Sequence, residues 1–186
     1  MELTNNTLFK CLDGRNATHG GNYRYVLKRW TPPIENMKAC VSGYHLARGA
    51  QVLRWLSKDL YVAEADPAYP IVDVDDKVAC GRVRIVEHLT TWNDTTARLF
   101  AADCAEAALL GGRACGREPD PRSWAAVDVA RRFARGEATR AELTAASDAA
   151  RDAARDAIDA ALFERLCLYL TGADLPPVQP LYGGAS

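Results

Sequence analysis

The sequence predicts an α+β protein, with a small mixed or antiparallel sheet over residues 5–90 and an Ala-rich helical bundle over residues 92–172. Two observations predict this class. In the first half, short apolar or aromatic runs are separated by clusters of turn residues, which is typical of strands. In the second half, apolar residues recur at helical spacing between clear cap signals. We expect the helical bundle to pack against the sheet.

Strands and turns alternate through the first half. The strand-like runs are LFKCL, YRYVL, GYHLA and LYVAEA, and GAQVLRWLSKDL between the last two has the apolar spacing of a short helix. The strongest β stretch is IVDVDDKVACGRVRIVEHL, where the acidic residues indicate a turn that connects two strands. Gly81 in that stretch predicts a bulge or a close approach of two backbones.

Helix signals begin after Thr91. Either Thr91 or Asn93 can cap a first helix, which the run GGRACGREPDP is expected to end. A second helix should start near Pro121 and stop before Gly136. A long Ala-rich helix then reaches Gly172, preceded by the capping-box pattern TRAE.

These boundaries predict three parts: a β-rich subdomain over residues 1–91, a helical subdomain over residues 92–172, and a tail over residues 173–186. The tail is rich in Pro and Gly, which favours an extended strap or disorder.

Composition narrows the class of protein. The net charge of −1 gives no electrostatic basis for binding nucleic acid or an anionic membrane. The apolar runs are too short to span a bilayer, and the first residues lack the pattern of a signal peptide. Six cysteines occur without any C-x-x-C spacing and mostly in apolar surroundings, so we expect reduced thiols, a cytoplasmic protein and no metal site.

Candidate chemistry centres on the stretch CVSGYHLAR. In an extended strand, Tyr44 and Leu46 share one face and His45 lies on the other. His45 is therefore the best candidate for lining a pocket, while His19, in the turn THGGN, is a weaker one. A reactive pair of Cys40 with His45 has no supporting local pattern.

Several strings resemble an uncharacterised family of actinobacterial and phage proteins. They are THGG, CVSGYHLAR, LYVAEA, DVDDKVACGRVRIVEHL and TWNDTTARLFAADCAEAAL, in that order. The run RSWAAVDVARRFARGEATRAEL is similar to the helical region of bacterial proteins described as immunity proteins. Neither resemblance supplies an activity.

A fold-level similarity concerns SGYHLARGAQVLRWL followed by LYVAEA, which resembles the strand–helix–strand segment of ADP-ribosyltransferases and RNA 2′-phosphotransferases. The resemblance implies that Gly43, Tyr44 and His45 border an NAD pocket, with Arg48 near its mouth. The first strand lacks the His or Arg of those families, and Glu87 would have to replace their catalytic Glu.

The sequence therefore leaves more than one function open. The first is a non-catalytic interaction protein of phage or actinobacterial accessory genes, needing no cofactor. It would bind a protein partner or self-associate through its helical half, in the cytoplasm of a bacterial host if phage-encoded. The alternative is a transferase that uses NAD or an RNA 2′-phosphate. A phage virion component is a further alternative.

Overall fold

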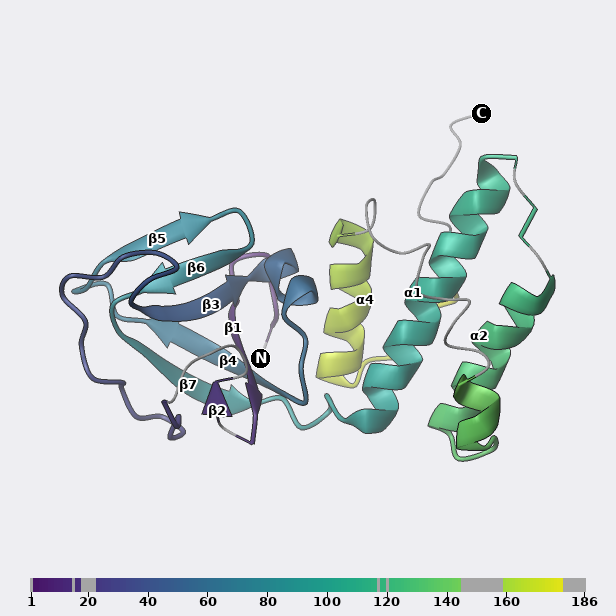
Figure 1. Ribbon diagram of the computed structural model, residues 1–186, viewed down its shortest axis with the longest axis horizontal. Helices are drawn as coiled ribbons and strands as arrows, with labels where there is room; N and C mark the ends of the chain where they lie inside the picture. Colours follow the sequence, from purple (N-terminus) through teal and green to yellow (C-terminus); the bar gives the residue numbers. More distant parts are fainter. Residues whose placement is uncertain are drawn as a thin grey trace. The chain divides into compact units, whose positions relative to one another are not determined.

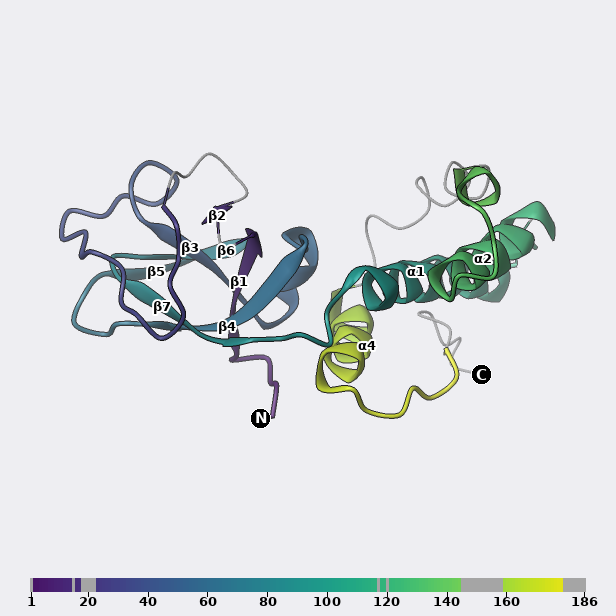
Figure 2. The same cartoon turned by 90° about the horizontal axis from the view of Figure 1, so that it is seen from below.

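A computed structural model describes residues 2–14, 16–17, 23–116, 118–119, 121–144 and 159–178. The chain divides into two compact units, Met1–Trp92 and Asn93–Ser186, here called the β unit and the helical unit. All described strands belong to the first unit and the long described helices to the second (Figures 1 and 2). The α+β class predicted from the sequence is confirmed.

The β unit is built around one antiparallel sheet. Its strands follow the order β5-β6-β3-β1-β4-β7, and the short β2 pairs with β1. Figure 1 shows β5 and β7 at opposite edges of this sheet. The strands are β1 (Leu8–Asp13), β2 (Asn16–Ala17), β3 (Tyr44–Arg48), β4 (Asp59–Ala65), β5 (Ile71–Val74), β6 (Lys77–Cys80) and β7 (Val83–His88).

The two edges of the sheet differ in how they are covered. The segment over residues 28–34 runs along the outer side of β7, where the amides of Lys28 and Thr31 donate to the carbonyls of Ile85 and Val83 at 2.7 and 2.9 Å. Among the described residues, β5 pairs with β6 alone. One edge strand is therefore covered, and the other keeps an open backbone edge.

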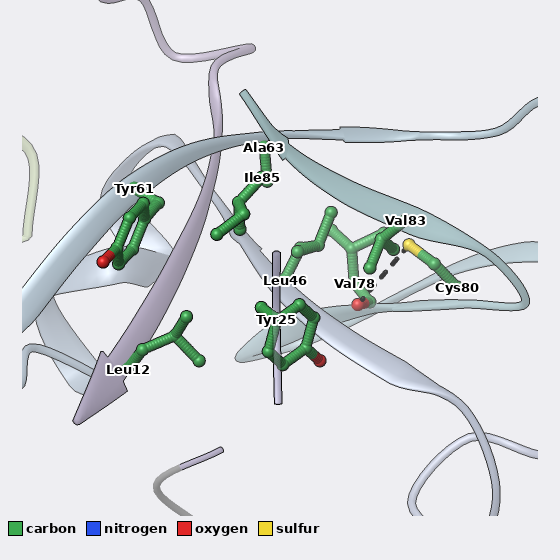
Figure 3. Close-up of a cluster of buried hydrophobic side chains, with 9 residues drawn as sticks. All are labelled: Leu12, Tyr25, Leu46, Tyr61, Ala63, Val78, Cys80, Val83 and Ile85. Atoms are coloured by element: carbon green, nitrogen blue, oxygen red, sulfur yellow. Dashed lines mark hydrogen bonds between the residues drawn. The ribbon is translucent and has the colours of Figure 1, made fainter. Parts of the chain in front are cut away.

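Both faces of the sheet bury apolar side chains: Phe9 and Leu60 are fully buried on one face, and an apolar cluster lies on the other, here called the core face. Leu12, Leu46 and Ile85 are almost fully buried there, together with Tyr25 from the segment that crosses this face (Figure 3). The alternation of strand residues explains the pattern, since side chains two positions apart share a face. The full cluster is Leu12, Tyr25, Leu46, Tyr61, Ala63, Val78, Cys80, Val83 and Ile85.

Gly81 joins β6 to β7 at a close approach of two backbones, as the sequence predicted. A Cβ at Gly81 would lie 2.6 Å from the carbonyl oxygen of Ile34. The amide of Ile34 donates to the carbonyl of Gly81 at 2.8 Å, which ties the covering segment to this turn.

Three expected elements differ from the structure. The run YRYVL forms no strand beyond a single bridge at Arg24, because its tyrosines pack onto the core face instead. The predicted helix after β3 is a 3-10 helix, η1 (Gly49–Arg54), since few residues separate β3 from β4. The first helix passes through the two glycines expected to end it, and Gly111 is buried there, so burial outweighs a cost of about 1 kcal/mol per glycine.

The helical unit contains α1 (Asp94–Ala114), α2 (Pro121–Ala134) and α4 (Asp159–Thr171). Asn93 caps α1 by accepting from the amides of Thr95 and Thr96, as one of the two predicted caps. No helix in the described part of the chain is long and apolar enough to cross a membrane.

The long Ala-rich helix can be followed only in part. Residues 140–144 are helical, and Thr139 and Glu142 form the predicted capping box, with Thr139 N donating to the Glu142 carboxylate at 2.7 Å. Residues 145–158, for which the sequence predicts the middle of this helix, lie outside the described residues, as do residues 179–186 of the tail.

Candidate functional site

Strand β3 carries three of the six residues singled out from the sequence, and a fourth, Gly43, directly precedes it. Leu46 is buried in the core cluster and Tyr44 packs against it, while His45 faces the opposite side and is half-buried. This is the alternation expected from the sequence. Gly43, just before β3, has φ +146°, and a Cβ there would lie 2.8 Å from Cγ of Met37. Only glycine fits this approach to the strand.

The imidazole of His45 is held away from water. Its Nε2 atom is buried and has no hydrogen-bond partner among the described residues. Desolvation lowers the pKa of His45, and the ammonium groups of Lys10 and Lys77 lower it further, against a smaller opposite effect of Asp76. The imidazole is therefore neutral at neutral pH.

Arg48, the last residue of β3, forms an ion pair within the β unit. Its Nε and Nη2 atoms donate to the two carboxylate oxygens of Asp73 at 3.1 and 3.3 Å. Its backbone amide donates to Gln51, whose side-chain amide in turn donates to the carbonyl of Val74. The bidentate ion pair of Arg48 with Asp73 joins the end of β3 to β5. The guanidinium that the resemblance places at the mouth of a pocket is therefore already paired.

One candidate residue is not brought to β3, and another is not among the described residues. Glu87 is an exposed residue of β7, opposite Val62, and strands β1 and β4 separate β7 from β3. Three strand spacings of about 4.8 Å put Glu87 about 14 Å from β3, beyond direct cooperation with His45. His19 lies outside the described residues.

Lys10 is a site residue that the sequence reasoning missed. It lies on the core face of β1 between Leu8 and Leu12, and its Nζ donates to the carbonyl of His45 at 2.7 Å. Desolvation lowers the pKa of Lys10 to about 8, against smaller opposite effects of Cys11 and Cys80. The sequence contained a signal for this position. In a strand, a lysine that lies two positions from a leucine on each side must point to the same face as those leucines.

Three tyrosines pack beside Lys10 on the core face. The ring centroids of Tyr23 and Tyr25 lie 5.0 Å apart, and those of Tyr23 and Tyr44 lie 5.6 Å apart, both edge to face. The Lys10 ammonium lies 5.0 Å from the centroid of the Tyr25 ring, a cation–π distance. The Tyr44 hydroxyl donates to the carbonyl of Pro32 at 3.0 Å. The Lys10 ammonium and the Tyr44 hydroxyl thus both donate to backbone carbonyls of the β unit.

Strand β5 presents a different kind of surface. Ile71 and Val72, adjacent residues of this edge strand, are 39% and 44% exposed. The strand ends in a turn that contains the acidic residues Asp75 and Asp76. An open backbone edge with exposed apolar side chains is the geometry by which proteins accept an added strand.

The described residues contain no group of three or more His, Cys, Asp or Glu side chains that could hold a metal ion. All six cysteines are free thiols, with Cys11 and Cys80 buried and Cys40 and Cys115 exposed. No protein-family model, curated protein or solved structure matches the chain.

Proposed function

We propose that the protein is a non-catalytic interaction protein that binds another protein through its β unit. The observation that carries this proposal is the open edge of β5, with Ile71 and Val72 exposed beside it. Exposed apolar side chains next to unpaired backbone groups favour contact with another chain.

The sequence indicated the helical half as the binding surface, and the exposed side chains favour the β unit instead. Of the six large apolar side chains exposed among the described residues, only Leu175 belongs to the helical unit. Val26, Leu27 and Val41 are exposed in the β unit together with the two residues of β5.

The state of the β3 residues supports a non-catalytic role. Arg48 is held by Asp73, His45 is a desolvated neutral imidazole, and Tyr44 donates to a backbone carbonyl. Arg48 and Tyr44 therefore make hydrogen bonds within the β unit that an NAD pocket would have to disrupt. The free thiols fit a reducing cytoplasm, the compartment that we propose for the protein.

Two assays test this function. We expect neither turnover of NAD or 2′-phosphorylated RNA nor a rise in thermal midpoint with either, although a ligand at one hundred times its dissociation constant would add about 2.7 kcal/mol of stability. Turnover that disappears in His45→Ala would establish the transferase instead.

The second assay is capture of partners from a lysate of the organism that encodes the chain. Val72→Lys should lose a partner that the wild type retains, because the charge lies on the proposed contact. Leu175→Lys is the matched control, since Leu175 is similarly exposed at 42% and belongs to the helical unit. Equal loss in both variants would contradict a contact through the β unit.

A further inference from the structure

The hairpin of β5 and β6 determines which backbone groups face outward. Val74 pairs with Lys77 across a two-residue turn, which makes that pair a hydrogen-bonded one. Hydrogen-bonded and non-hydrogen-bonded pairs alternate along an antiparallel ladder. The N–H and C=O groups of Ile71 and Asp73 therefore point away from β6, toward the open edge.

Side chains of β5 differ on the two faces of the sheet. Val72 and Val74 lie on one face, and Ile71 and Asp73 lie on the other with the core residues Cys80 and Val78. One face of the edge is thus purely apolar, and the other combines an apolar with an acidic side chain.

The charge of this edge is negative. Asp73 is shared with Arg48, and its side chain is 61% exposed. Asp76 lies 3.5 Å from Lys77, whereas Asp75 is exposed and has no ion pair among the residues that the structure describes. The strand itself, Ile71–Val74, contains no basic residue.

We propose that the outer edge of β5 binds an extended segment of a partner protein in which apolar and basic residues alternate. This rests on the proposed function and names the chemistry of the partner. The segment adds a strand through the backbone groups of Ile71 and Asp73. Its apolar side chains lie beside Val72 and Val74, and its basic side chains lie beside Asp73 and the turn at Asp75.

Charge complementarity favours this partner over a second copy of the chain. A copy of β5 would bring Asp73 and no basic residue to the same edge. A basic segment neutralises the acids, and the aliphatic stem of a lysine can also cover the exposed Ile71.

The test uses two fluorescein-labelled hexapeptides with blocked ends and the full chain. One peptide alternates lysine and valine, and the other alternates glutamate and valine. Fluorescence anisotropy should show saturable binding of the lysine peptide, at least about tenfold tighter than that of the glutamate peptide, which corresponds to about 1.4 kcal/mol. Equal affinities for the two peptides, or no binding of the lysine peptide, would overturn the proposal.

Three variants locate the binding. Ile71→Pro removes an outward N–H and should abolish binding of the lysine peptide. Asp75→Lys should weaken it at least about fivefold, because it reverses an exposed charge at the edge. Glu87→Lys is the matched control, since it makes the same charge change on an exposed residue of β7 and should leave binding unchanged. If Ile71→Pro does not fold, the comparison of Asp75→Lys with Glu87→Lys decides whether the peptide binds at the edge of β5.

Two other outcomes count against the proposal. Unchanged affinity in Asp75→Lys would place the peptide elsewhere. A wild-type dimer in sedimentation that becomes monomeric in Ile71→Pro would make a second copy the occupant of the edge. Failure of this proposal can be distinguished from failure of the proposed function, because turnover of NAD or 2′-phosphorylated RNA is measured without the peptides.

Discussion

The Lys10 ammonium donates a 2.7 Å hydrogen bond to the carbonyl of His45, beyond the point where β1 and β3 stop pairing. The ladder between these strands joins Leu8 to Arg48 and Phe9 to Ala47. A side-chain donor thus satisfies a carbonyl that lies past the end of the ladder. The contact requires a partly desolvated ammonium, which is why the pKa of Lys10 falls to about 8.

Lys10→Met should change the pH dependence of stability between about pH 8 and 10.5. In this range the unfolded chain holds a proton on Lys10 that the folded chain has lost, so the contribution of Lys10 to the free energy of unfolding rises with pH. The rise amounts to at most about 3.5 kcal/mol, since one pKa unit corresponds to about 1.4 kcal/mol. Urea titrations of the wild type and of Lys10→Met, compared pH by pH, measure it.

The comparison with a variant is necessary because other groups titrate in the same range. Burial raises the pKa of Cys11 to about 12 and that of Cys80 to about 11, and both lower stability as pH rises. These thiols remain in the variant. Lys77→Met is the control for the loss of a lysine charge, since Lys77 lies over the Trp55 ring and not among the core residues beside Lys10. Identical profiles for wild type and Lys10→Met would show that Lys10 is not desolvated.

His45 should make the protein less stable in mild acid. Desolvation lowers the pKa of His45 below the ordinary histidine value of 6.5, so the unfolded chain binds a proton first as pH falls below that value. The free energy of unfolding therefore decreases with falling pH in this window. His45→Gln should flatten the decrease and cost less than about 1 kcal/mol at pH 7, as expected outside the core.

The control for His45 is the substitution His88→Gln. The His88 ring stacks on Tyr61 at 4.5 Å between centroids and is far along the sheet from β3. It should retain the acid-dependent loss that His45 causes. If His45→Gln keeps the wild-type acid profile, the imidazole is open to solvent.

Gly43→Ala should destabilise the β unit by about 1–3 kcal/mol, because alanine rarely adopts its backbone conformation and meets Met37. Gly14→Ala gives the cost of a left-handed residue in open space, since Gly14 has φ +57° and no atom within 4 Å of a Cβ position. Thermal unfolding of both variants measures the difference. A cost no larger at Gly43 than at Gly14 would mean that Met37 moves aside freely.

Local signals were sufficient to predict most elements. Alternating apolar residues predicted β1, β3, β4 and the strands on either side of the acidic turn, and the cap residues predicted where helices begin. Gly136, at φ +79°, follows α2 as its position after the apolar run indicated. These features depend on residues that are close together in the sequence, so they can be predicted from one sequence alone.

Features that depend on distant residues could not be predicted in the same way. The expected site joined His45 with Glu87, but the strand order places two strands between them, and strand order is not encoded locally. The guanidinium of Arg48 is paired with Asp73, a residue 25 positions later, and the sequence gives no local signal of this pairing. Exposure of Val72 likewise follows from β5 being an edge strand, although its sequence resembles that of a central one.

Four of the six thiols should fall into two classes of reactivity. Cys40 and Cys115 are exposed, whereas Cys11 and Cys80 are buried and burial raises their pKa. A thiol reagent at pH 8 should therefore modify Cys40 and Cys115 first, with Cys11 and Cys80 reacting only after addition of denaturant. Mass spectrometry of partially labelled protein identifies the sites. Early labelling of Cys80 would contradict a closed core.

Asp103 should be the most sensitive charged residue of the helical unit. It is 3% exposed on α1, and its carboxylate accepts from Arg131 of α2 and from Arg165 and Tyr169 of α4, each at 2.6 Å. One buried anion thus joins three helices. Asp103→Asn leaves Arg165 without a carboxylate, whereas Arg131 keeps its ion pair with Glu106 at 2.5 Å. Breaking a buried ion pair typically costs about 3–5 kcal/mol.

Asp94→Asn on the same helix is the matched control for Asp103→Asn. Asp94 lies 3.8 Å from Arg98, and its side chain is 80% exposed. Exposed pairs at this spacing contribute about 0.3–0.5 kcal/mol, so its loss should hardly change the urea midpoint. Far-ultraviolet circular dichroism at 222 nm follows the helices in both variants. A loss below about 1 kcal/mol in Asp103→Asn would mean that water replaces the carboxylate, and that apolar contacts among α1, α2 and α4 hold the helices together without it.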